Sequence, residues 1–562
     1  MALGYRSPVV ASASVHPVTM TAIVTHLPCI IIAQADATAI DTGDTAWMLT
    51  STALVLMMTI PGLALFYGGL VRSKNVLSTI MHSFFCAALI SVVWVVVGYS
   101  IAFGPSGSNW VGGFEYVGLR GLLWDRADVA PTIPHLLFVA FQGTFAIITP
   151  ALISGALAER MRFRAYALFI GLWSVVIYAP LCYWVWGGGW IGGKLGALDF
   201  AGGTVVHIAS GSAALVCALY LGRRVGHGSE PMPPHNLPLT VLGAALLWVG
   251  WFGFNAGSAL GANDVAVVAF VNTNTAAAAG VLAWLVFESL RTGKPTVLGA
   301  ASGAVAGLVA ITPAAGFVAP WASIPIGMAG GAACYAAVSF KSRLGYDDAL
   351  DVVGIHGVGG ILGALATGIF ATATVNPAII DLTFGLDGGL IEGHAVLLWR
   401  QLIAVIATIA FCGLGTWILL IVTNAVVKVR VEHKDEVTGL DISQHSERAY
   451  SLVESGGQVV SAEAEKRKAL RIPLRGERFT AVVEGVEPEE LVSHWRHLCV
   501  DYGVGVSSEL KELYGSFTTV RGNRFNFRGG DKEQIRSTLE RLFQGVSKSA
   551  KVRIDSQSEP RP

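Results

Sequence analysis

The segment DFAGGTVVHIASG, residues 199–211, places a histidine, His207, inside an otherwise apolar run. A second segment, DVVGIHGVGG, residues 351–360, does the same with His356, and an aspartate stands eight residues before each histidine. An ionisable side chain at membrane depth is costly and by default faces a cavity or a pathway. The matched pair therefore predicts that both imidazoles line one pore, and a packing role for each histidine is the alternative.

The chain around these segments is apolar and poor in charge. Hydrophobic residues make up 53% of the 562 residues and charged residues 14%, whereas about 25% of the residues in a soluble domain are charged. Gly299, Gly303 and Gly307 share one helical face, which favours close contact between helices. This composition excludes a disordered chain, a collagen-like repeat and a small disulfide-stapled protein, and it favours an all-α polytopic membrane protein.

Eleven apolar runs have the length that a transmembrane helix needs, about 17–25 residues. They cover 47–70, 77–103, 133–157, 165–186, 203–222, 237–260, 264–290, 297–315, 320–340, 352–372 and 401–427. His207 lies in the fifth run and His356 in the tenth. We therefore expect eleven transmembrane helices with a five-plus-five inverted repeat, whose pseudo-two-fold axis brings the two histidines together near the membrane midplane.

Basic residues in the short loops indicate the orientation, because cytoplasmic loops collect Lys and Arg. The loops after the odd-numbered runs hold most of these residues, including the cluster Arg160, Arg162 and Arg164. The bias predicts a multi-pass protein of the cell inner (plasma) membrane, with the mature N-terminus outside and the C-terminus in the cytoplasm.

The first 35 residues have the features of a secretory leader. Arg6 is their only Lys, Arg, Asp or Glu, residues 18–32 are mildly apolar, and Ala33-Gln34-Ala35 has the small-x-small form of a signal-peptidase site. We expect a signal peptide over 1–35, with an uncleaved leader as the alternative, followed by a membrane domain over 36–430.

The chain after residue 430 differs in character, since it holds more than half of the 38 basic and of the 38 acidic residues. We expect a cytoplasmic regulatory segment and linker over 431–475, then a small cytoplasmic α+β domain over 476–556. Its order βαββαβ is that of a ferredoxin-like module, with strands at 478–486, 504–514, 517–528 and 550–555. The net charge of zero does not suggest a nucleic-acid partner.

Long stretches of the chain resemble the ammonium transporter family (Amt/Mep/Rh). The resemblance covers about residues 40–450 and is carried by PGLALFYGGLVRSKN (61–75), ALAERMRF (156–163), DFAGGTVVHIASG (199–211), GWFGFNAGS (250–258), GIHGVGG (354–360) and GLDISQHSERAY (439–450). It implies eleven spans, an inverted repeat and a homotrimer of independent pores. The family's cytoplasmic signature His-Gly-Glu reads His445-Ser446-Glu447 here, which puts the conformation of that segment in doubt.

The resemblance also implies an external ammonium site, an aromatic gate, a buried acid and a pair of pore histidines. A tryptophan face with a hydroxyl nearby suits a small cation. The buried acid is expected to cap a helix, with an ion ligand as the alternative. The implied residues are Phe145, Trp186 and Ser258 for substrate binding, Phe145 and Phe254 for the gate, Asp199 for the outer vestibule, and His207 and His356 for the pore pair.

We expect an ammonium channel or transporter and not an enzyme, with no cofactor and no metal site. Ammonium would lose a proton near the gate and pass as ammonia, while the histidine pair relays the proton, and methylammonium is expected to serve as an analogue of the substrate. Potassium cannot shed its charge and would be excluded by the apolar pore. An ammonium sensor that signals through the C-terminal domain is the alternative, and a gas channel is the runner-up within transport. The family suggests a PII signal protein as a partner at the cytoplasmic face.

Overall fold

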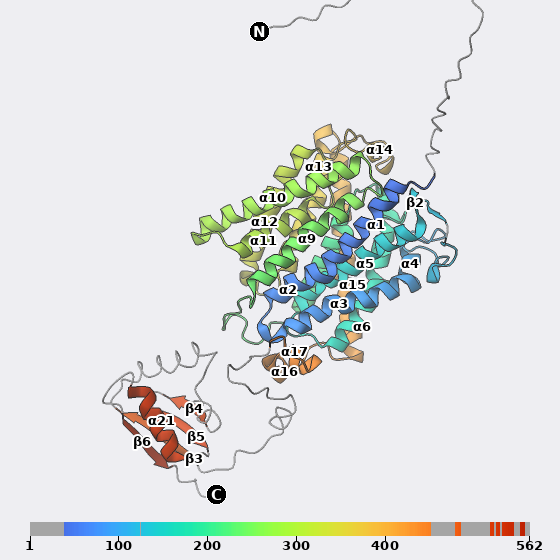
Figure 1. The fold of residues 1–562 in the computed structure, drawn as a ribbon. Helices are drawn as coiled ribbons and strands as arrows, with labels where there is room; N and C mark the ends of the chain where they lie inside the picture. Colours follow the sequence, from blue (N-terminus) through green and yellow to red (C-terminus); the bar gives the residue numbers. More distant parts are fainter. Residues whose placement is uncertain are drawn as a thin grey trace, which may run out of the picture. The chain divides into compact units, whose positions relative to one another are not determined.

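The apolar runs of the sequence form helices that lie side by side in one bundle (Figure 1). The computed structural model describes residues 39–123, 125–450, 478–484, 517–521, 524–528, 531–544 and 551–556. The predicted signal peptide over 1–35 and most of the predicted linker up to 475 lie outside these residues. The chain divides into two compact units, Met1–Ala449 and Tyr450–Pro562.

Among the described residues, ten helices are long and apolar enough to cross a bilayer. They run over Thr42–Leu70, Ser73–Phe103, His135–Leu157, Phe163–Val185, Gly203–Leu221, Leu237–Gly257, Asp264–Thr292, Pro320–Lys341, Val353–Phe370 and Ala395–Val426. A shorter apolar helix, α11 (Val297–Ile311), stands where the eighth run was expected. It ends two residues before Pro313, whose nitrogen has no hydrogen to donate to a continuing helix. The prediction of a polytopic helical membrane protein is confirmed.

Several of these spans change from α-helical to π-helical winding for one turn. The turn Met58–Leu63 contains Pro61, whose nitrogen has no hydrogen to donate to the helix ladder. Further π-helical turns are Trp94–Gly98, Ser174–Tyr178, Gly203–Ile208 and Val353–Gly357. The last two contain the histidines His207 and His356, so both of these residues lie where the regular helix is interrupted.

The labelled elements of the first unit follow in chain order. They are α1 (Thr42–Met57), α2 (Ala64–Leu70), α3 (Val76–Val93), α4 (Tyr99–Phe103), β1 (Arg126–Ala127), β2 (Ala130–Pro134), α5 (His135–Leu157), α6 (Phe163–Trp173), α7 (Ala179–Val185), α8 (Ala209–Leu221), α9 (Leu237–Gly257), α10 (Asp264–Thr292), α11, α12 (Ser323–Leu344), α13 (Val358–Phe370), α14 (Ile379–Leu382), α15 (Ala395–Val426), α16 (His433–Thr438) and α17 (Leu440–His445). The first unit therefore continues past the last long helix and includes α16 and α17.

Glycines allow α10 and α11 to approach closely. A Cβ atom added at Gly280 would lie 2.5 Å from the carbonyl oxygen of Gly303 and 2.8 Å from Cα of Gly307. No larger residue fits there without a shift of the backbone. The predicted contact through the face that holds Gly303 and Gly307 is confirmed, and it draws helices together in lipid by close packing.

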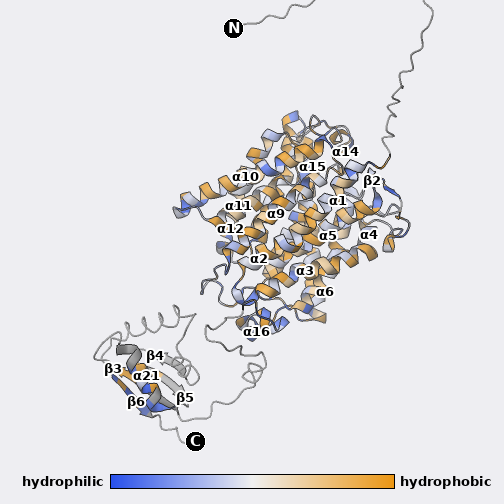
Figure 2. Cartoon of the chain, in the orientation of Figure 1, coloured by the Kyte–Doolittle hydropathy of each residue, from blue (hydrophilic) through white to orange (hydrophobic). Residues whose placement is uncertain are grey.

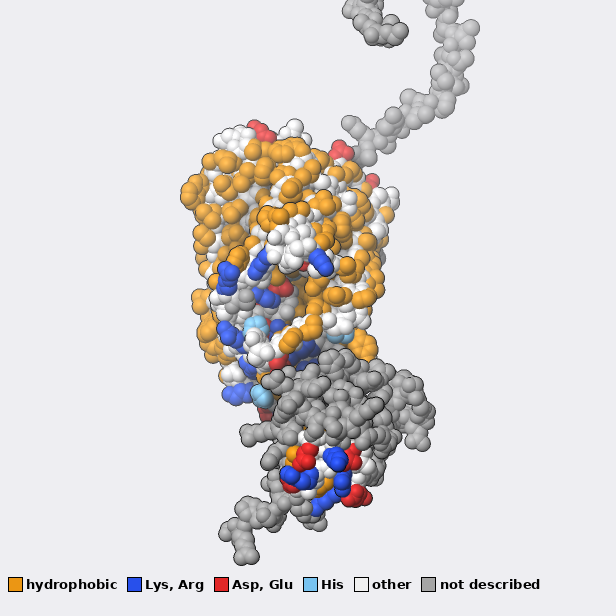
Figure 3. Space-filling model, turned by 90° about the vertical axis from the view of Figure 1, so that its left-hand side faces the viewer, with side chains coloured by type: hydrophobic (Ala, Val, Ile, Leu, Met, Phe, Trp, Pro, Cys, Tyr) orange, Lys and Arg blue, Asp and Glu red, His pale blue; other side chains and the backbone are white. Residues whose placement is uncertain are grey.

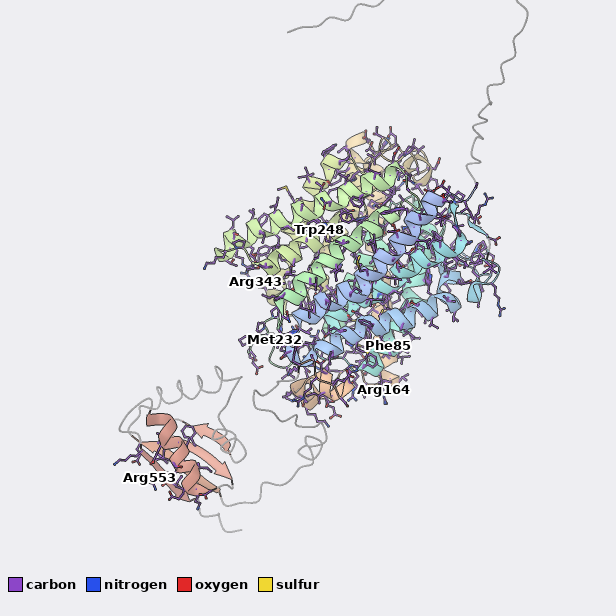
Figure 4. All side chains as sticks on the ribbon, in the orientation of Figure 1. Phe85, Arg164, Met232, Trp248, Arg343 and Arg553 are labelled. Atoms are coloured by element: carbon purple, nitrogen blue, oxygen red, sulfur yellow. The ribbon has the colours of Figure 1, made fainter. Side chains whose placement is uncertain are left out.

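The outside of the first unit is apolar over the bodies of its helices (Figure 2). In the face drawn in Figure 3, hydrophobic side chains dominate, and Lys and Arg gather toward one end. Phe85 and Trp248, labelled in Figure 4, lie along the bodies of α3 and α9, whereas Arg164 and Arg343 lie near the ends of α6 and α12. This arrangement is typical of a lipid-facing belt with a charged rim.

An antiparallel sheet in the order β4-β5-β3-β6 forms the second unit together with a helix. Its described elements are β3 (Arg478–Glu484), β4 (Phe517–Arg521), β5 (Arg524–Arg528), α21 (Lys532–Gln544) and β6 (Lys551–Ser556). The prediction of one strand over 517–528 is wrong, because Phe517–Arg521 and Arg524–Arg528 are two separate strands that pair with each other in antiparallel orientation. The expected strand at 504–514 and the first expected helix lie outside the described residues, so the ferredoxin-like module stays a prediction.

Candidate functional site

Asp199 begins the segment that holds the first histidine. Its carboxylate accepts four backbone N–H hydrogen bonds at 2.7–3.2 Å. The donors are Gly202, Gly203, Thr204 and Val205, which open the π-helical turn and leave its first N–H groups satisfied. This geometry is that of a helix cap, and the negative charge also suits the N-terminal end of the helix dipole.

Asp348 occupies the same position before the second histidine. Its Oδ2 atom accepts the backbone N–H of Val353 at 2.7 Å, where the turn Val353–Gly357 begins. The repeated spacing in the sequence thus corresponds to two copies of one local structure, an aspartate cap followed by a π-helical turn that carries a histidine.

The two histidines meet inside the first unit. Nδ1 of His207 and Nδ1 of His356 lie 3.2 Å apart, and both side chains are buried. A hydrogen bond between two Nδ1 atoms requires a proton on one ring and a lone pair on the other, so the pair shares one proton at this contact. Glycines permit the approach, since a Cβ atom added at Gly211 would lie 2.3 Å from Cα of Gly357.

Two phenylalanines stack beside the histidine pair. The ring centroids of Phe145 and Phe254 are 4.3 Å apart with nearly parallel planes, and neither side chain is exposed by more than 1%. Phe254 also stacks on His207 at 6.1 Å. The two residues expected to form a gate are therefore stacked on each other, and one of them contacts the histidine pair.

Trp186 extends this group of aromatic residues. It contacts the Phe145 ring edge to face at 5.8 Å, and its indole N–H donates to the backbone oxygen of Asp199 at 2.9 Å. Trp186 is half-buried. The Ser258 hydroxyl, also half-buried, donates to the backbone oxygen of Phe254 at 2.9 Å. We call the series Trp186, Phe145, Phe254, His207 and His356 the aromatic column.

The sequence analysis did not predict one further aromatic residue beside the histidine pair, Trp251. Its ring stacks on His207 at 5.5 Å, and its indole N–H donates to the Thr312 hydroxyl at 2.9 Å. Trp251 precedes Phe254 by three residues on α9, so both side chains fall on one helix face. That spacing was the only available signal, and a tryptophan in an apolar helix is usually a packing residue.

A buried ionic network connects the ends of several helices and was also missed. The Asp347 carboxylate contacts Arg160 at 2.9 Å and Arg224 at 2.9 Å. Glu159 contacts Arg224 at 3.3 Å and Arg72 at 2.5 Å. The side chains of Asp347, Glu159 and Arg160 are fully buried. The sequence shows these charges in loops, but it does not show that they face one another away from water.

The arginines determine the charge of both acids in this network. Burial opposes ionisation of Glu159, and the guanidinium groups of Arg224 and Arg72 outweigh it, so its pKa lies below the ordinary value. Burial likewise opposes ionisation of Asp347, and hydrogen bonds and charge from Arg224, with Arg160, hold its pKa well below the ordinary range. Both acids are therefore ionised at neutral pH.

The segment after the last long helix is bound to the start of α3. The Asp441 carboxylate accepts the N–H of Ser78 at 2.8 Å and of Leu77 at 3.1 Å, and thus satisfies N–H groups in the first turn of that helix. The backbone N–H of Leu440 donates to the Asn75 amide oxygen at 2.8 Å. Residues 439–449 thus belong structurally with the helices.

Ser446 stands where the family signature His-Gly-Glu has glycine, and this difference affects the backbone at the end of α17. It follows α17 as the C-terminal cap, with φ 59° and ψ 29°, in the left-handed region that glycine adopts freely. A residue with a Cβ atom pays about 1–2 kcal/mol for that conformation. The segment keeps the backbone form that a glycine would have, at a cost in stability.

Replacing Ser446 with glycine is therefore expected to stabilise the docked segment by about 1 kcal/mol. Slower amide hydrogen exchange across α17 measures the effect. Ser443→Gly is the matched control, because Ser443 lies within α17 and glycine there costs about 1 kcal/mol of helix stability. Equal exchange rates in both variants would contradict the strain at Ser446.

Among the described residues, no group of three or more His, Cys, Asp or Glu side chains could hold a metal ion. The site thus consists of stacked aromatic rings and a buried imidazole pair within a bundle of long apolar helices. These features define a polytopic membrane protein with a site of aromatic rings and imidazoles inside its helix bundle.

Comparisons with known proteins identify the family. A model of the Ammonium Transporter Family matches residues 46–450. The ammonium transporter of Bacillus subtilis (strain 168) is 54% identical over 409 residues, which cover 73% of this chain and 98% of that protein. The ammonium transporter of Aquifex aeolicus (strain VF5) is 50% identical over 422 residues, covering 75% and 96%. The chain belongs to the Ammonium Transporter Family, and it is a transporter rather than an enzyme.

Solved structures agree with this assignment. The crystal structure of Saccharomyces cerevisiae Mep2 matches with a TM-score of 0.66 and 40% identity, covering 70% of this chain and 89% of that one. A structure described as a Sensor Amt Protein matches with a TM-score of 0.65 and 28% identity, covering 72% and 98%.

Proposed function

We propose that this ammonium transporter binds ammonium beside Trp186, removes one proton near Phe145 and Phe254, and conducts ammonia past the histidine pair. The observation that carries the proposal is the aromatic column, which ends at two buried imidazoles 3.2 Å apart. A tryptophan face attracts a cation with about 0.5–2 kcal/mol, and Ser258 adds a hydroxyl oxygen near the gate.

Selectivity follows from the interior of the column. Phe145 and Phe254 are buried against one another, so an ion that passes them leaves its water behind. Ammonium avoids most of that cost by giving up a proton, and potassium has no proton to give. Because His207 and His356 already share a proton, the pair can accept one at one end and release one at the other.

Ammonium-evoked current in proteoliposomes tests this proposal. We expect a current with ammonium and methylammonium and none with potassium at equal concentration. An ammonium sensor that signals through the C-terminal domain is the second candidate, favoured by the likeness to the structure described as a Sensor Amt Protein. A protein that binds ammonium without current or ammonia flux would support the sensor.

Trp186→Leu is expected to raise the half-saturating ammonium concentration about tenfold and to change the maximal current less. The reason is that the indole face contributes about 1–2 kcal/mol of cation attraction outside the step that removes the proton. Concentration dependence of the current measures this split. Trp190→Leu is the control, since Trp190 packs on Trp184 outside the column. An unchanged half-saturating concentration in Trp186→Leu would make that residue an interface anchor only.

We also propose the membrane arrangement. In it α11 also crosses the membrane, as the eighth of eleven helices in chain order, and the two aspartate-capped turns are equivalent parts of a five-plus-five inverted repeat. The loop that holds Arg160 faces the cytoplasm of the inner (plasma) membrane, because basic residues gather there. Residues 1–35 act as a signal peptide, and the functional unit is a homotrimer.

The tail after residue 450 tunes transport in this proposal, either by replacing a PII signal protein at the cytoplasmic face or by modulating its binding. The support is that Leu440 and Asp441 are bound to the start of α3 in a segment, 439–449, that precedes the tail directly in sequence. Deletion of residues 471–562 tests it. A truncated transporter with unchanged current and unchanged response to PII would make the tail a passenger.

A further inference from the structure

The two aspartate caps differ in one respect. Asp199 uses both carboxylate oxygens, and each accepts two backbone N–H groups. Asp348 uses Oδ2 for the N–H of Val353, whereas its Oδ1 atom is buried and has no hydrogen-bond partner among the described residues. The whole residue is 0% exposed. A buried carboxylate oxygen without a donor is costly, so this oxygen calls for a function or an additional partner.

None of the described groups around Asp348 donates a hydrogen bond to its Oδ1 atom. The Lys341 ammonium donates to the backbone oxygen of Asp348 at 2.8 Å and forms its ion pair with Asp351. Arg160, Tyr67, Tyr346 and Asp351 also lie near enough to interact with the Asp348 charge. The backbone N–H groups of Val352 and Val353 favour the ionised form of the carboxyl group. Burial raises the pKa of Asp348 to about 6, against the opposing effect of the Lys341 charge. The carboxyl can therefore take up and release a proton near neutral pH.

The two caps also lie at different ends of the site. The backbone of Asp199 accepts the indole N–H of Trp186, which is at the ammonium-binding end of the column. Asp348 follows Asp347, the acid held by Arg160 and Arg224 in the buried ionic network. The histidine pair is thus flanked by a fully bonded acid toward Trp186 and by an acid with a free oxygen toward the arginine-rich end.

We propose that Asp348 is the acceptor of the proton that leaves the histidine pair toward the arginine-rich end. This inference rests on the proposed function. The N–H bond of a protonated His356 breaks, a water molecule carries the proton, and an O–H bond forms at Oδ1 of Asp348. The imidazole becomes neutral and the carboxylate becomes a carboxylic acid, which then gives the proton to water at that end. Asp199 cannot do the same without losing bonds of its cap.

Asp348→Asn separates this role from capping, because the amide oxygen can still accept the N–H of Val353 but cannot take up a proton. We expect a folded protein whose ammonium-evoked current is about a hundredfold lower. The current of the unmodified protein should vary with the pH on the arginine-rich side around pH 6, and this dependence should vanish in the variant. Asp348→Glu keeps a carboxyl group, so this variant should retain part of the current and part of its pH dependence.

Asp199→Asn is the matched control. This substitution replaces one of the two carboxylate oxygens that together accept four N–H groups, so we expect lower thermal stability. The current should keep its dependence on pH near 6, because Asp348 is unchanged. An Asp348→Asn protein with the unmodified current and pH profile would overturn the inference and leave the proposed function intact. Absence of any ammonium current in the unmodified protein would overturn both.

If Asp348→Asn fails to fold, infrared difference spectroscopy of the unmodified protein supplies the second measurement. A carboxylic acid carbonyl band that titrates near pH 6 and shifts in Asp348→Glu supports the assignment. No such band over that range would overturn it, because the proposed acceptor must exist in both protonation states.

Discussion

The double variant His207→Ala with His356→Ala is expected to fold and to lose most of its ammonium current, by about a hundredfold or more. Proton transfer by a positioned side chain contributes typically about 10²–10⁴-fold to a rate, and this variant removes both imidazoles of the pair. The space that they leave also admits water to the apolar column. We therefore expect the ratio of ammonium to potassium current to fall as well.

Currents in proteoliposomes at matched ammonium and potassium concentrations measure both effects. His394→Ala is the control, because His394 pairs with Asp387 in a loop outside the column. Its currents should equal those of the unmodified protein. A double variant that carries methylammonium at the original rate and still excludes potassium would show that the imidazoles pack the site and relay nothing.

Arg160→Leu is expected to lower the free energy of unfolding by about 3–5 kcal/mol. The substitution leaves the buried Asp347 carboxylate with Arg224 and His227 but without the guanidinium at 2.9 Å. It also removes the donor to the backbone oxygen of Ala156 at 2.8 Å. Thermal unfolding in detergent measures the loss.

Arg162→Leu is the matched control two residues away. Arg162 contacts Glu432 at 3.7 Å with both side chains partly exposed, and such a pair is worth about 0–1 kcal/mol. Equal unfolding temperatures for Arg160→Leu and Arg162→Leu would contradict the importance of the buried network.

The pH dependence of the Arg160→Leu effect has a definite sign. The pKa of Asp347 is depressed in the folded state, chiefly by Arg224 and Arg160 acting against burial. A depressed carboxyl pKa stabilises the fold above the unfolded value, near 3.8, and the stabilisation is lost as the pH falls. The difference between the unmodified protein and Arg160→Leu should therefore shrink below that pH.

The second unit shows how far strand prediction from sequence reaches. The apolar run Ala481, Val482 and Val483, which is buried throughout, lies in β3 where a strand was expected. The strands β4 and β5 were read as one strand because only two residues, 522 and 523, separate them in the sequence. The sequence does not show that the two halves of that run pair with each other, and the pairing of Val520 with Phe525 reveals it.

The sequence by itself determined the long apolar helices, the two histidines within them and the equal spacing of each histidine from an aspartate. These features are local, because helix length and residue spacing along one chain depend on neighbouring residues. The other residues of the aromatic column, Trp186, Phe145 and Phe254, came from the resemblance to a family, and the structure shows their contacts.

The tertiary structure alone decided the contacts across helices. The 3.2 Å approach of His207 to His356 depends on Gly211 meeting Gly357, and the stacking of Trp251 depends on how α9 faces the turn that holds His207. The free oxygen of Asp348 and the full set of bonds at Asp199 likewise follow from the backbone around each cap. Contacts between residues far apart in the chain arise from the packing of helices in three dimensions. The spacing of residues along the sequence does not show their distances, their burial or their hydrogen bonds.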